Sequence, residues 1–162
     1  MTLVTRYPNN PILTKNDVPY EVATVHNAGV TKYGDEYIML FRAHKLNGRS
    51  ILGLARSKDG YHFKVEEKPF MVPATSGIFA EYEAFGVEDP RITCIDGEYL
   101  ITNSAYSRHG VRIGLAKTSD WKNVERFSLI TEADYRNVVI FPEKINGLYA
   151  RLDRPHSEIS PW

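Results

Sequence analysis

The sequence predicts an all-β protein built from repeated four-stranded antiparallel units. Tyr, Phe, Ile and Val are plentiful in the 162 residues and stand in short alternating runs broken by Gly, Asp, Asn and Pro, which is typical of strands and turns. No stretch carries a 3.6-residue apolar stripe over three turns, so little helix is expected. Similar strand and turn patterns also recur along the chain, whose length allows one domain with a substantial core.

Residues 1–20 read as an irregular lead-in, and residues 21–162 as a single domain. The first repeated unit is expected to place strands at 25–31, 37–43 and 50–57. A turn at Lys58-Asp59-Gly60 leads to a fourth strand that opens at Tyr61.

The same pattern returns further along the chain. The second unit is expected to have strands at 89–95, 99–102 and 111–118, and a third begins with a hairpin of strands 138–141 and 149–152 around Asn146-Gly147. The segment Gly-Leu-Ala-Arg-Ser-Lys-Asp at 53–59 is similar to Gly-Leu-Ala-Lys-Thr-Ser-Asp at 114–120. This match is closer than the shared composition of a β-sandwich would produce, so we favour a β-propeller.

The repeat also brings polar residues from different units together. Asn27 and Asp89 each lie ten residues before a matched tyrosine, at 37 and 99. Arg42, Ser104 and Arg154 each lie five residues after the matched tyrosines 37, 99 and 149. These strand ends surround the central channel of a propeller, so we expect the five side chains to ring one pocket.

A pocket with one carboxylate, an amide and several arginines suits a polyhydroxylated ligand together with an anion. Arg136 precedes the third inner strand and would converge with Arg154 on that anion. The aromatic residues Tyr82, Phe85 and Tyr106 could stack against sugar faces.

Two adjacent carboxylates stand at the centre of the chain, in Glu88-Asp89-Pro90-Arg91. Pro90 fits the first residue of a strand and favours an extended Asp89, which would then project from the strand mouth as a catalytic acid must. The alternative interpretation is a structural Asp/Arg salt bridge at the end of a strand.

Composition narrows the class of protein. Acidic and basic residues balance at 20 each, so we expect neither nucleic acid nor membrane as a partner. A single cysteine, no signal peptide and no apolar run long enough to span a bilayer favour a cytoplasmic protein. The five histidines lack the spacing of metal ligands, and no P-loop or dinucleotide fingerprint is present, so neither a metal nor a cofactor is expected.

Three segments together resemble glycoside hydrolase family 130, the β-mannoside phosphorylases and related mannosidases. The segments are Gly86-Val87-Glu88-Asp89-Pro90-Arg91, the run at 137–147 (NVVIFPEKING), and Leu152-Asp153-Arg154-Pro155. The resemblance covers essentially the whole chain. It implies a five-bladed β-propeller of which this chain is the N-terminal half, about two and a half blades.

The resemblance also implies a reaction: inverting phosphorolysis of short β-mannosides to α-mannose 1-phosphate, with inorganic phosphate as co-substrate. Asp89 would be the one catalytic acid, acting through the mannosyl 3-hydroxyl. The other residues that the resemblance indicates are Asn27, Arg42, Glu88 and Tyr106 for the substrate, and Arg49, Arg136 and Arg154 for phosphate.

Two alternatives stay open, a β-mannosidase of the same family and a non-catalytic sugar-binding propeller. Two anion-binding arginines favour the phosphorylase, because a water nucleophile has no use for them. The sequence does not determine the linkage, which depends on loops such as residues 70–85, and it leaves open a homo-oligomer.

Overall fold

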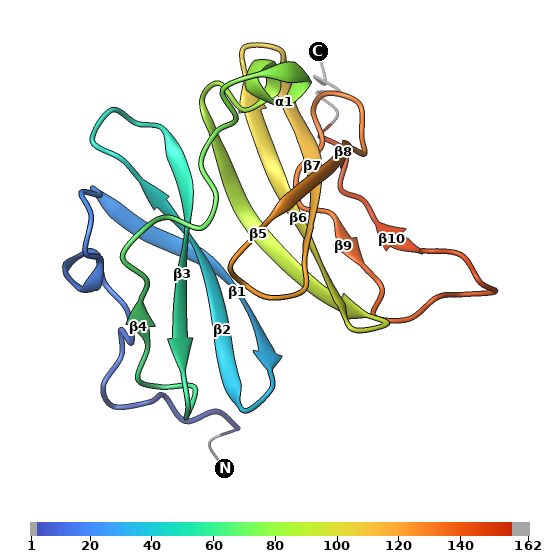
Figure 1. The fold of residues 1–162 in the computed structure, drawn as a ribbon. Coiled ribbons are helices and arrows are strands. Elements are labelled where there is room, and N and C mark those ends of the chain that lie inside the picture. The colour runs from blue at the N-terminus through green and yellow to red at the C-terminus, as the bar shows by residue number, and fades with distance from the viewer. Residues whose placement is uncertain (1–2, 157–162) are drawn as a thin grey trace.

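The computed structural model describes residues 3–156, and these are mostly β structure (Figure 1). One helix of six residues, α1 (Gly77–Tyr82), and a 3-10 turn, η1 (Lys15–Asp17), are the only helical elements in this range, so the expected low helix content is confirmed. The strands are β1 (Thr24–Tyr33), β2 (Glu36–His44), β3 (Ser50–Ser57), β4 (Lys64–Val65), β5 (Gly86–Ile95), β6 (Glu98–Ser107), β7 (Gly110–Thr118), β8 (Glu125–Leu129), β9 (Val139–Ile140) and β10 (Arg151–Leu152).

The first eight strands form two four-stranded antiparallel units, as the sequence predicts. Strands β1 to β4 pair in chain order, and β5 to β8 repeat the arrangement. A parallel pair between Ser50 and Gly86 joins the two units into one eight-stranded sheet. The arrangement of the units as propeller blades therefore stays a prediction.

The two units share the hydrogen-bonded turn that follows their third strand. In the first unit the Ser57 hydroxyl accepts from the N–H groups of Asp59 and Gly60, and Asp59 Oδ1 accepts from those of Tyr61 and His62. Thr118 and Asp120 repeat this arrangement in the second unit. The turn occupies the residues predicted to open the fourth strand, so that strand begins at Lys64 and not at Tyr61.

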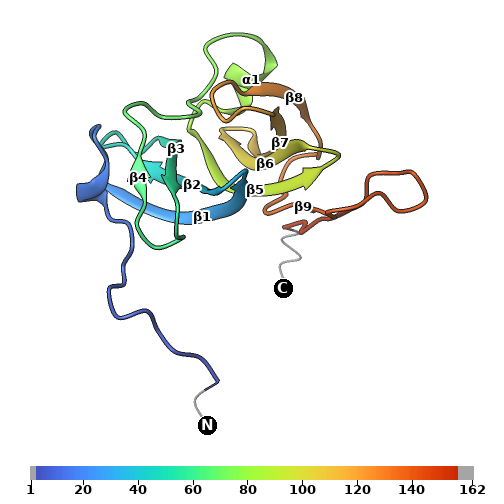
Figure 2. The ribbon, with the colours of Figure 1, turned by 60° about the horizontal axis from the view of Figure 1, so that its bottom comes forward.

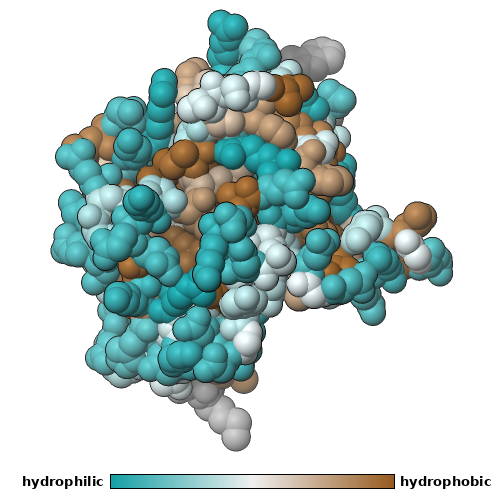
Figure 3. Space-filling model, in the orientation of Figure 1, coloured by the Kyte–Doolittle hydropathy of each residue, from teal (hydrophilic) through white to brown (hydrophobic). Residues whose placement is uncertain are grey.

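The third hairpin turns where the sequence places it but pairs over a shorter length. Asn146 and Gly147 both have positive φ (53° and 79°), as a type I′ turn requires, between the bridged Ile145 and Leu148. Strands β9 and β10 are only two residues long, and Tyr149 lies outside them. The hairpin projects from the body (Figures 1 and 3), and its exposed apolar side chains include Ile145, Leu148, Tyr149 and Leu152.

The larger core cluster lies between the two units. It joins buried residues of the first unit to buried residues of the second, namely Ile38, Leu40, Leu52 and Leu54 with Val87, Tyr99, Ile101 and Trp121. A second cluster around Phe41 and Ile51 is covered by the lead-in, whose Tyr20 packs on it. The irregular N-terminal segment therefore stabilises the first unit by covering apolar surface.

The first strands of the two units, β1 and β5, lie beside each other (Figure 2). Gly29 makes this approach close, because a Cβ atom there would come within 2.9 Å of the Pro90 carbonyl oxygen. This contact brings the polar residues of both strands into one site. No helix within residues 3–156 is long and apolar enough to cross a membrane.

Candidate active site

Asn27 and Asp89 occupy matching bulges in β1 and β5. The pairing register shifts between His26 and Gly29 in one strand and between Glu88 and Arg91 in the other. Both residues have a φ of 49°, in the left-handed region that Asn and Asp tolerate better than other side chains. The equivalence expected from the repeat is confirmed, and it extends to the backbone conformation.

The prediction of an extended Asp89 at a strand mouth is wrong. Strand β5 begins at Gly86 and continues through Asp89 and Pro90 to Ile95. Pro90 has no N–H group to contribute to a ladder, and the bulge places it where none is needed. The bulge turns the Asp89 side chain towards β1 and β2, as its hydrogen bonds show.

The two oxygens of Asp89 differ in their surroundings. Oδ1 accepts a 2.8 Å hydrogen bond from Asn27 Nδ2 and a 3.1 Å bond from Arg42 Nη1. No donor within residues 3–156 bonds Oδ2, although Asp89 is only 8% exposed. The carboxylate is therefore held by one oxygen while the other keeps its hydrogen-bonding capacity.

The Asp/Arg salt bridge of the alternative interpretation is also present, but the arginine that Asp89 binds is on another strand and is not the neighbouring Arg91. Arg42, on β2, binds Asp89 and also donates to Glu88 Oε1 at 2.7 Å. Arg91 instead donates to the Pro90 carbonyl oxygen. The ion pair thus links β2 to β5 within the ring of polar residues.

The electrostatics favour an ionised Asp89 in the absence of ligand. Burial raises the pKa of Asp89, but the hydrogen bonds from Asn27 and Arg42 and the charges of Arg42 and Arg91 outweigh it, so the pKa lies below its ordinary value. Burial, with the nearby charge of Arg42, lowers the pKa of His26.

Arg136 and Tyr106 adjoin this cluster. Arg136 Nη1 lies 3.8 Å from Glu88 Oε2, and its guanidinium lies over the Tyr106 ring at 5.8 Å. Tyr106 packs edge-to-face on Phe85 at 5.4 Å between ring centroids, and both rings are partly exposed. Two of the three aromatics predicted near the mouth are therefore together, whereas Tyr82 packs against His109 and Arg112.

The remaining predicted residues, Arg154, Arg49 and Ser104, are not among the described hydrogen-bond or ion-pair partners of Asp89. The Arg136 N–H donates to the Arg154 carbonyl oxygen at 3.0 Å, so the two backbones are adjacent, but the Arg154 side chain is exposed. Arg49 is exposed in the loop before Ser50. Ser104 lies opposite Glu88 on β6 and is 1% exposed, and its buried hydroxyl has no hydrogen-bond partner among the described residues.

Sequence reasoning missed Ser50 and His44, which both contact Arg42. The Arg42 Nε–H donates to the Ser50 hydroxyl at 3.2 Å, and the Ser50 hydroxyl donates to Glu88 Oε1 at 2.9 Å. His44 Nε2 lies 2.6 Å from Arg42 Nη2. The alternation of a strand could have indicated His44, which lies two residues after Arg42 and so shares its face.

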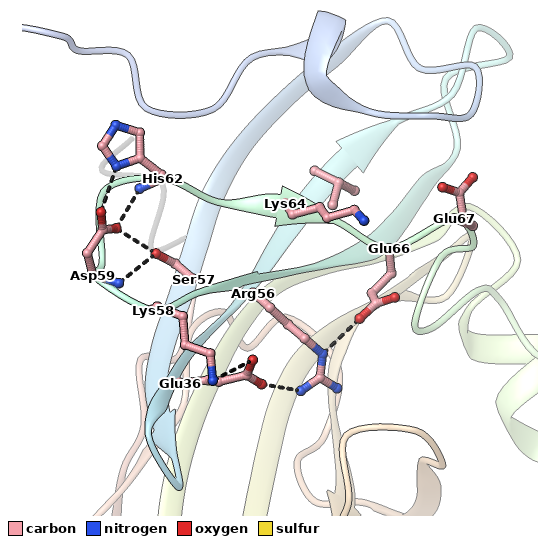
Figure 4. A pocket seen from close by; sticks show the side chains of 10 residues that line it. Glu36, Arg56, Ser57, Lys58, Asp59, His62, Lys64, Glu66 and Glu67 are labelled. Carbon is pink, nitrogen blue, oxygen red and sulfur yellow. Dashed lines mark hydrogen bonds and ion pairs between the residues drawn. The ribbon is translucent and has the colours of Figure 1, made fainter.

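A second charged hollow lies at the opposite end of β2 and β3 (Figure 4). Its charges are largely satisfied among themselves: Arg56 binds Glu36 and Glu66, Lys58 binds Glu36, and Asp59 binds His62. We interpret it as a structural ion-pair network. Within the described part of the chain, no cluster of three or more His, Cys, Asp or Glu side chains could hold a metal ion.

Comparison with known proteins identifies relatives of this chain. A beta-1,2-mannobiose phosphorylase of Listeria innocua is 33% identical over 93% of the chain, and a 1,2-beta-oligomannan phosphorylase of Thermoanaerobacter is 32% identical over 98%. The match spans 57% and 56% of those two proteins, so the chain covers little more than half of their length.

A solved structure agrees with these sequences. The Listeria innocua beta-1,2-mannobiose phosphorylase in complex with beta-1,2-mannobiose superimposes with a TM-score of 0.84 and 31% identity, over 95% of this chain and 59% of that one. The model of glycoside hydrolase family 130, described as beta-1,4-mannooligosaccharide phosphorylase, matches residues 3–160. The chain therefore belongs to glycoside hydrolase family 130, the family that its sequence resembles.

Proposed function

We propose that this chain forms the N-terminal part of a five-bladed β-propeller that catalyses inverting phosphorolysis of short β-linked manno-oligosaccharides. The observation that carries the proposal is the asymmetric binding of Asp89, with Oδ1 held by Asn27 and Arg42 and Oδ2 unbonded among residues 3–156. A proton donor has to be fixed in place and still keep one oxygen for the reacting proton.

In the proposed reaction an oxygen of phosphate attacks the anomeric carbon from the face opposite the leaving group. The glycosidic bond breaks, and its oxygen receives the proton of the mannosyl 3-hydroxyl, which Asp89 replaces with its own. One carboxylic acid suffices, because phosphate takes the place of the base-activated water in an inverting hydrolase. The products are α-mannose 1-phosphate and the shortened saccharide.

The low pKa of Asp89 in the free chain is compatible with this role once phosphate is considered. A general acid must carry its proton when the reaction begins. An anion that binds close by raises the pKa of a carboxyl group through like-charge repulsion. Phosphate held by Arg136, with Arg49 and Arg154 as further candidates, would therefore favour the protonated form of Asp89.

Substrate residues follow from the same cluster. Asn27 and Arg42 would bind the mannosyl unit beside Asp89, and the exposed ring of Tyr106 would contact the saccharide. The named relatives suggest β-1,2-mannobiose as the first substrate to test, with a β-1,4-linked oligosaccharide beside it. The exposed apolar surface of the third hairpin would be covered by the rest of the propeller.

The test is to incubate the protein with each saccharide in the presence and absence of phosphate and to follow the products by phosphorus NMR. We expect phosphate-dependent formation of α-mannose 1-phosphate. Mannose release that does not depend on phosphate would identify a β-mannosidase instead. Saccharide binding without turnover would leave the non-catalytic sugar-binding propeller.

A further inference from the structure

The Glu88 carboxylate lies between two arginines that belong to different parts of the proposed site. Oε1 accepts from Arg42, which binds the acid Asp89, and Oε2 lies 3.8 Å from Arg136, which is a candidate phosphate ligand. We propose that Glu88 is a positioning residue that fixes Arg42 against Asp89 and restrains Arg136, and that it is not a ligand of the sugar. Its catalytic consequence rests on the proposed function, but its contacts do not.

The Oε1 side of Glu88 is closed to a ligand. Arg42 Nη2 donates to Oε1 at 2.7 Å, the Ser50 hydroxyl donates to the same oxygen at 2.9 Å, and Arg42 Nε donates to Ser50 at 3.2 Å. These three bonds form a ring that fixes the plane of the guanidinium. The Glu88 side chain is 4% exposed and Ser50 is fully buried, so the ring excludes a sugar hydroxyl.

His44 completes the fixation of Arg42. A guanidinium can only donate hydrogen bonds, so His44 Nε2, at 2.6 Å from Nη2, has to be the acceptor. Both N–H groups of Nη2 and the one on Nε are then engaged by Glu88, His44 and Ser50. Nη1 is the nitrogen left to bind Asp89, which is the orientation that Asp89 requires.

The Oε2 side of Glu88 opposes the binding of an anion. At 3.8 Å the contact with Arg136 is an ion pair without a hydrogen bond, and the Arg136 side chain is 35% exposed and accessible to a ligand. A phosphate at Arg136 would compete with the negative charge of Glu88 for the same guanidinium. Removing that charge should therefore tighten phosphate binding even as it loosens Arg42.

The first test measures the affinity for inorganic phosphate in Glu88→Gln, which keeps the shape and an acceptor oxygen but removes the charge. Phosphate is titrated into the 162-residue protein while the Arg136 Nε–H signal is followed by NMR. We expect binding to be about two- to fivefold tighter than in the unsubstituted protein, the effect of one partly exposed charge. Glu83→Gln is the matched control, because Glu83 is likewise buried and paired with an arginine, Arg126, and phosphate affinity should not change there.

The second test compares Glu88→Leu with Glu88→Gln. In the unsubstituted protein the bonded guanidinium of Arg42 should rotate slowly, so its Nη signals are resolved. Glu88→Leu should average these signals, and Glu88→Gln should preserve them in part. Where turnover is measurable, Glu88→Gln should lower kcat by about tenfold, since a charge-assisted hydrogen bond becomes a neutral one, while KM for phosphate falls.

Each other result would overturn the proposal. A raised KM for the mannoside with kcat and the KM for phosphate both unchanged would make Glu88 a substrate ligand. Phosphate affinity that is unchanged in Glu88→Gln, or absent from both proteins, would remove the coupling to Arg136. Unchanged Arg42 signals in Glu88→Leu would remove the positioning role. Both NMR measurements report on the contacts of Glu88 with Arg42 and Arg136 even if no mannose 1-phosphate forms. Failure of the proposed function would therefore be distinguished from failure of the positioning role.

Discussion

Asn27 and Asp89, 62 residues apart, stand at the same position of two repeated strands and are joined by a 2.8 Å hydrogen bond. Each has a φ of 49° and lies in a bulge of its strand. The amide donates and the carboxylate accepts, so the pair satisfies one oxygen of Asp89 while Arg42 approaches the same atom. This relationship connects the repeat in the sequence to the chemistry of the site, and the first predictions concern it.

Asp89→Asn should abolish turnover while preserving the fold. Asparagine tolerates the positive φ and its carbonyl oxygen can still accept from Asn27, but its amide cannot donate the reacting proton. We expect kcat to fall by about 10² to 10⁴, the contribution of a general acid. Asp96→Asn is the control, because Asp96 also has positive φ (53°) but lies in the turn between β5 and β6, and its turnover should be normal. Equal turnover in both variants would show that Asp89 is not the general acid.

Arg42→Lys should weaken the site although it keeps the positive charge. A lysine cannot bind Asp89, Glu88, Ser50 and His44 at once in the planar arrangement of a guanidinium. We expect the pKa of Asp89 to rise towards its ordinary value, as measured by carbon-detected NMR titration of the carboxyl groups. Arg56→Lys, in the ion-pair network of Figure 4, should leave that pKa unchanged.

Stability at low pH should depend on Asp89. Its pKa in the folded chain is lowered, so the ionised form stabilises the fold above the unfolded-state pKa of about 4, and this contribution is lost as pH falls through the folded value. The difference in free energy of unfolding between the unsubstituted protein and Asp89→Asn should therefore shrink between pH 6 and pH 3 in urea titrations. The exposed Asp17 and Asp59 also have lowered pKa values, but they are present in both proteins and cancel. A difference independent of pH would contradict the ionic stabilisation.

Gly53 and Gly114, matched by the repeat, should respond unequally to alanine. A Cβ atom at Gly53 would lie 2.2 Å from Phe41 Cζ in the core, whereas at Gly114 its nearest neighbour is the Asn103 side-chain oxygen at 3.0 Å. The Phe41 ring is fixed by its packing, so Gly53→Ala should lower the free energy of unfolding by about 1–3 kcal/mol. Gly114→Ala should cost less, and an equal cost measured by chemical denaturation would contradict this packing.

Tyr20→Phe should leave the protein as stable or make it more stable. The Tyr20 hydroxyl is buried without a hydrogen-bond partner among the described residues, and burial raises the pKa of this phenol to about 12. Deleting the oxygen removes a desolvated group and keeps the ring on the first-unit core, so the free energy of unfolding should rise by up to about 1 kcal/mol. A clear loss of stability would show that the hydroxyl has a partner after all.

The repeat made most of the strands predictable, since matched tyrosines and Gly-Leu-Ala runs recur along the chain. It also predicted that Asn27, Arg42 and Asp89 meet, because equivalent positions in adjacent units face one another. The bulge at Asp89 was not predictable from Pro90 alone, because a proline after Asp89 is equally compatible with an extended strand start, and the contact of Pro90 with Gly29 belongs to the neighbouring unit. The contacts of Ser50 were not predictable either, because they depend on the pairing of β3 with β5, which no local sequence pattern encodes.

The matching bulges suggest how one scaffold could acquire two chemical roles. Two repeated strands with the same bulge place two side chains in equivalent positions, so a single substitution is enough to give the two positions different chemistry. If positions 27 and 89 both held aspartate, the two acids would repel each other and share a proton. An asparagine at position 27 instead gives a neutral neighbour whose amide donates to Asp89 without competing for its proton, so the two matched positions have different chemical roles.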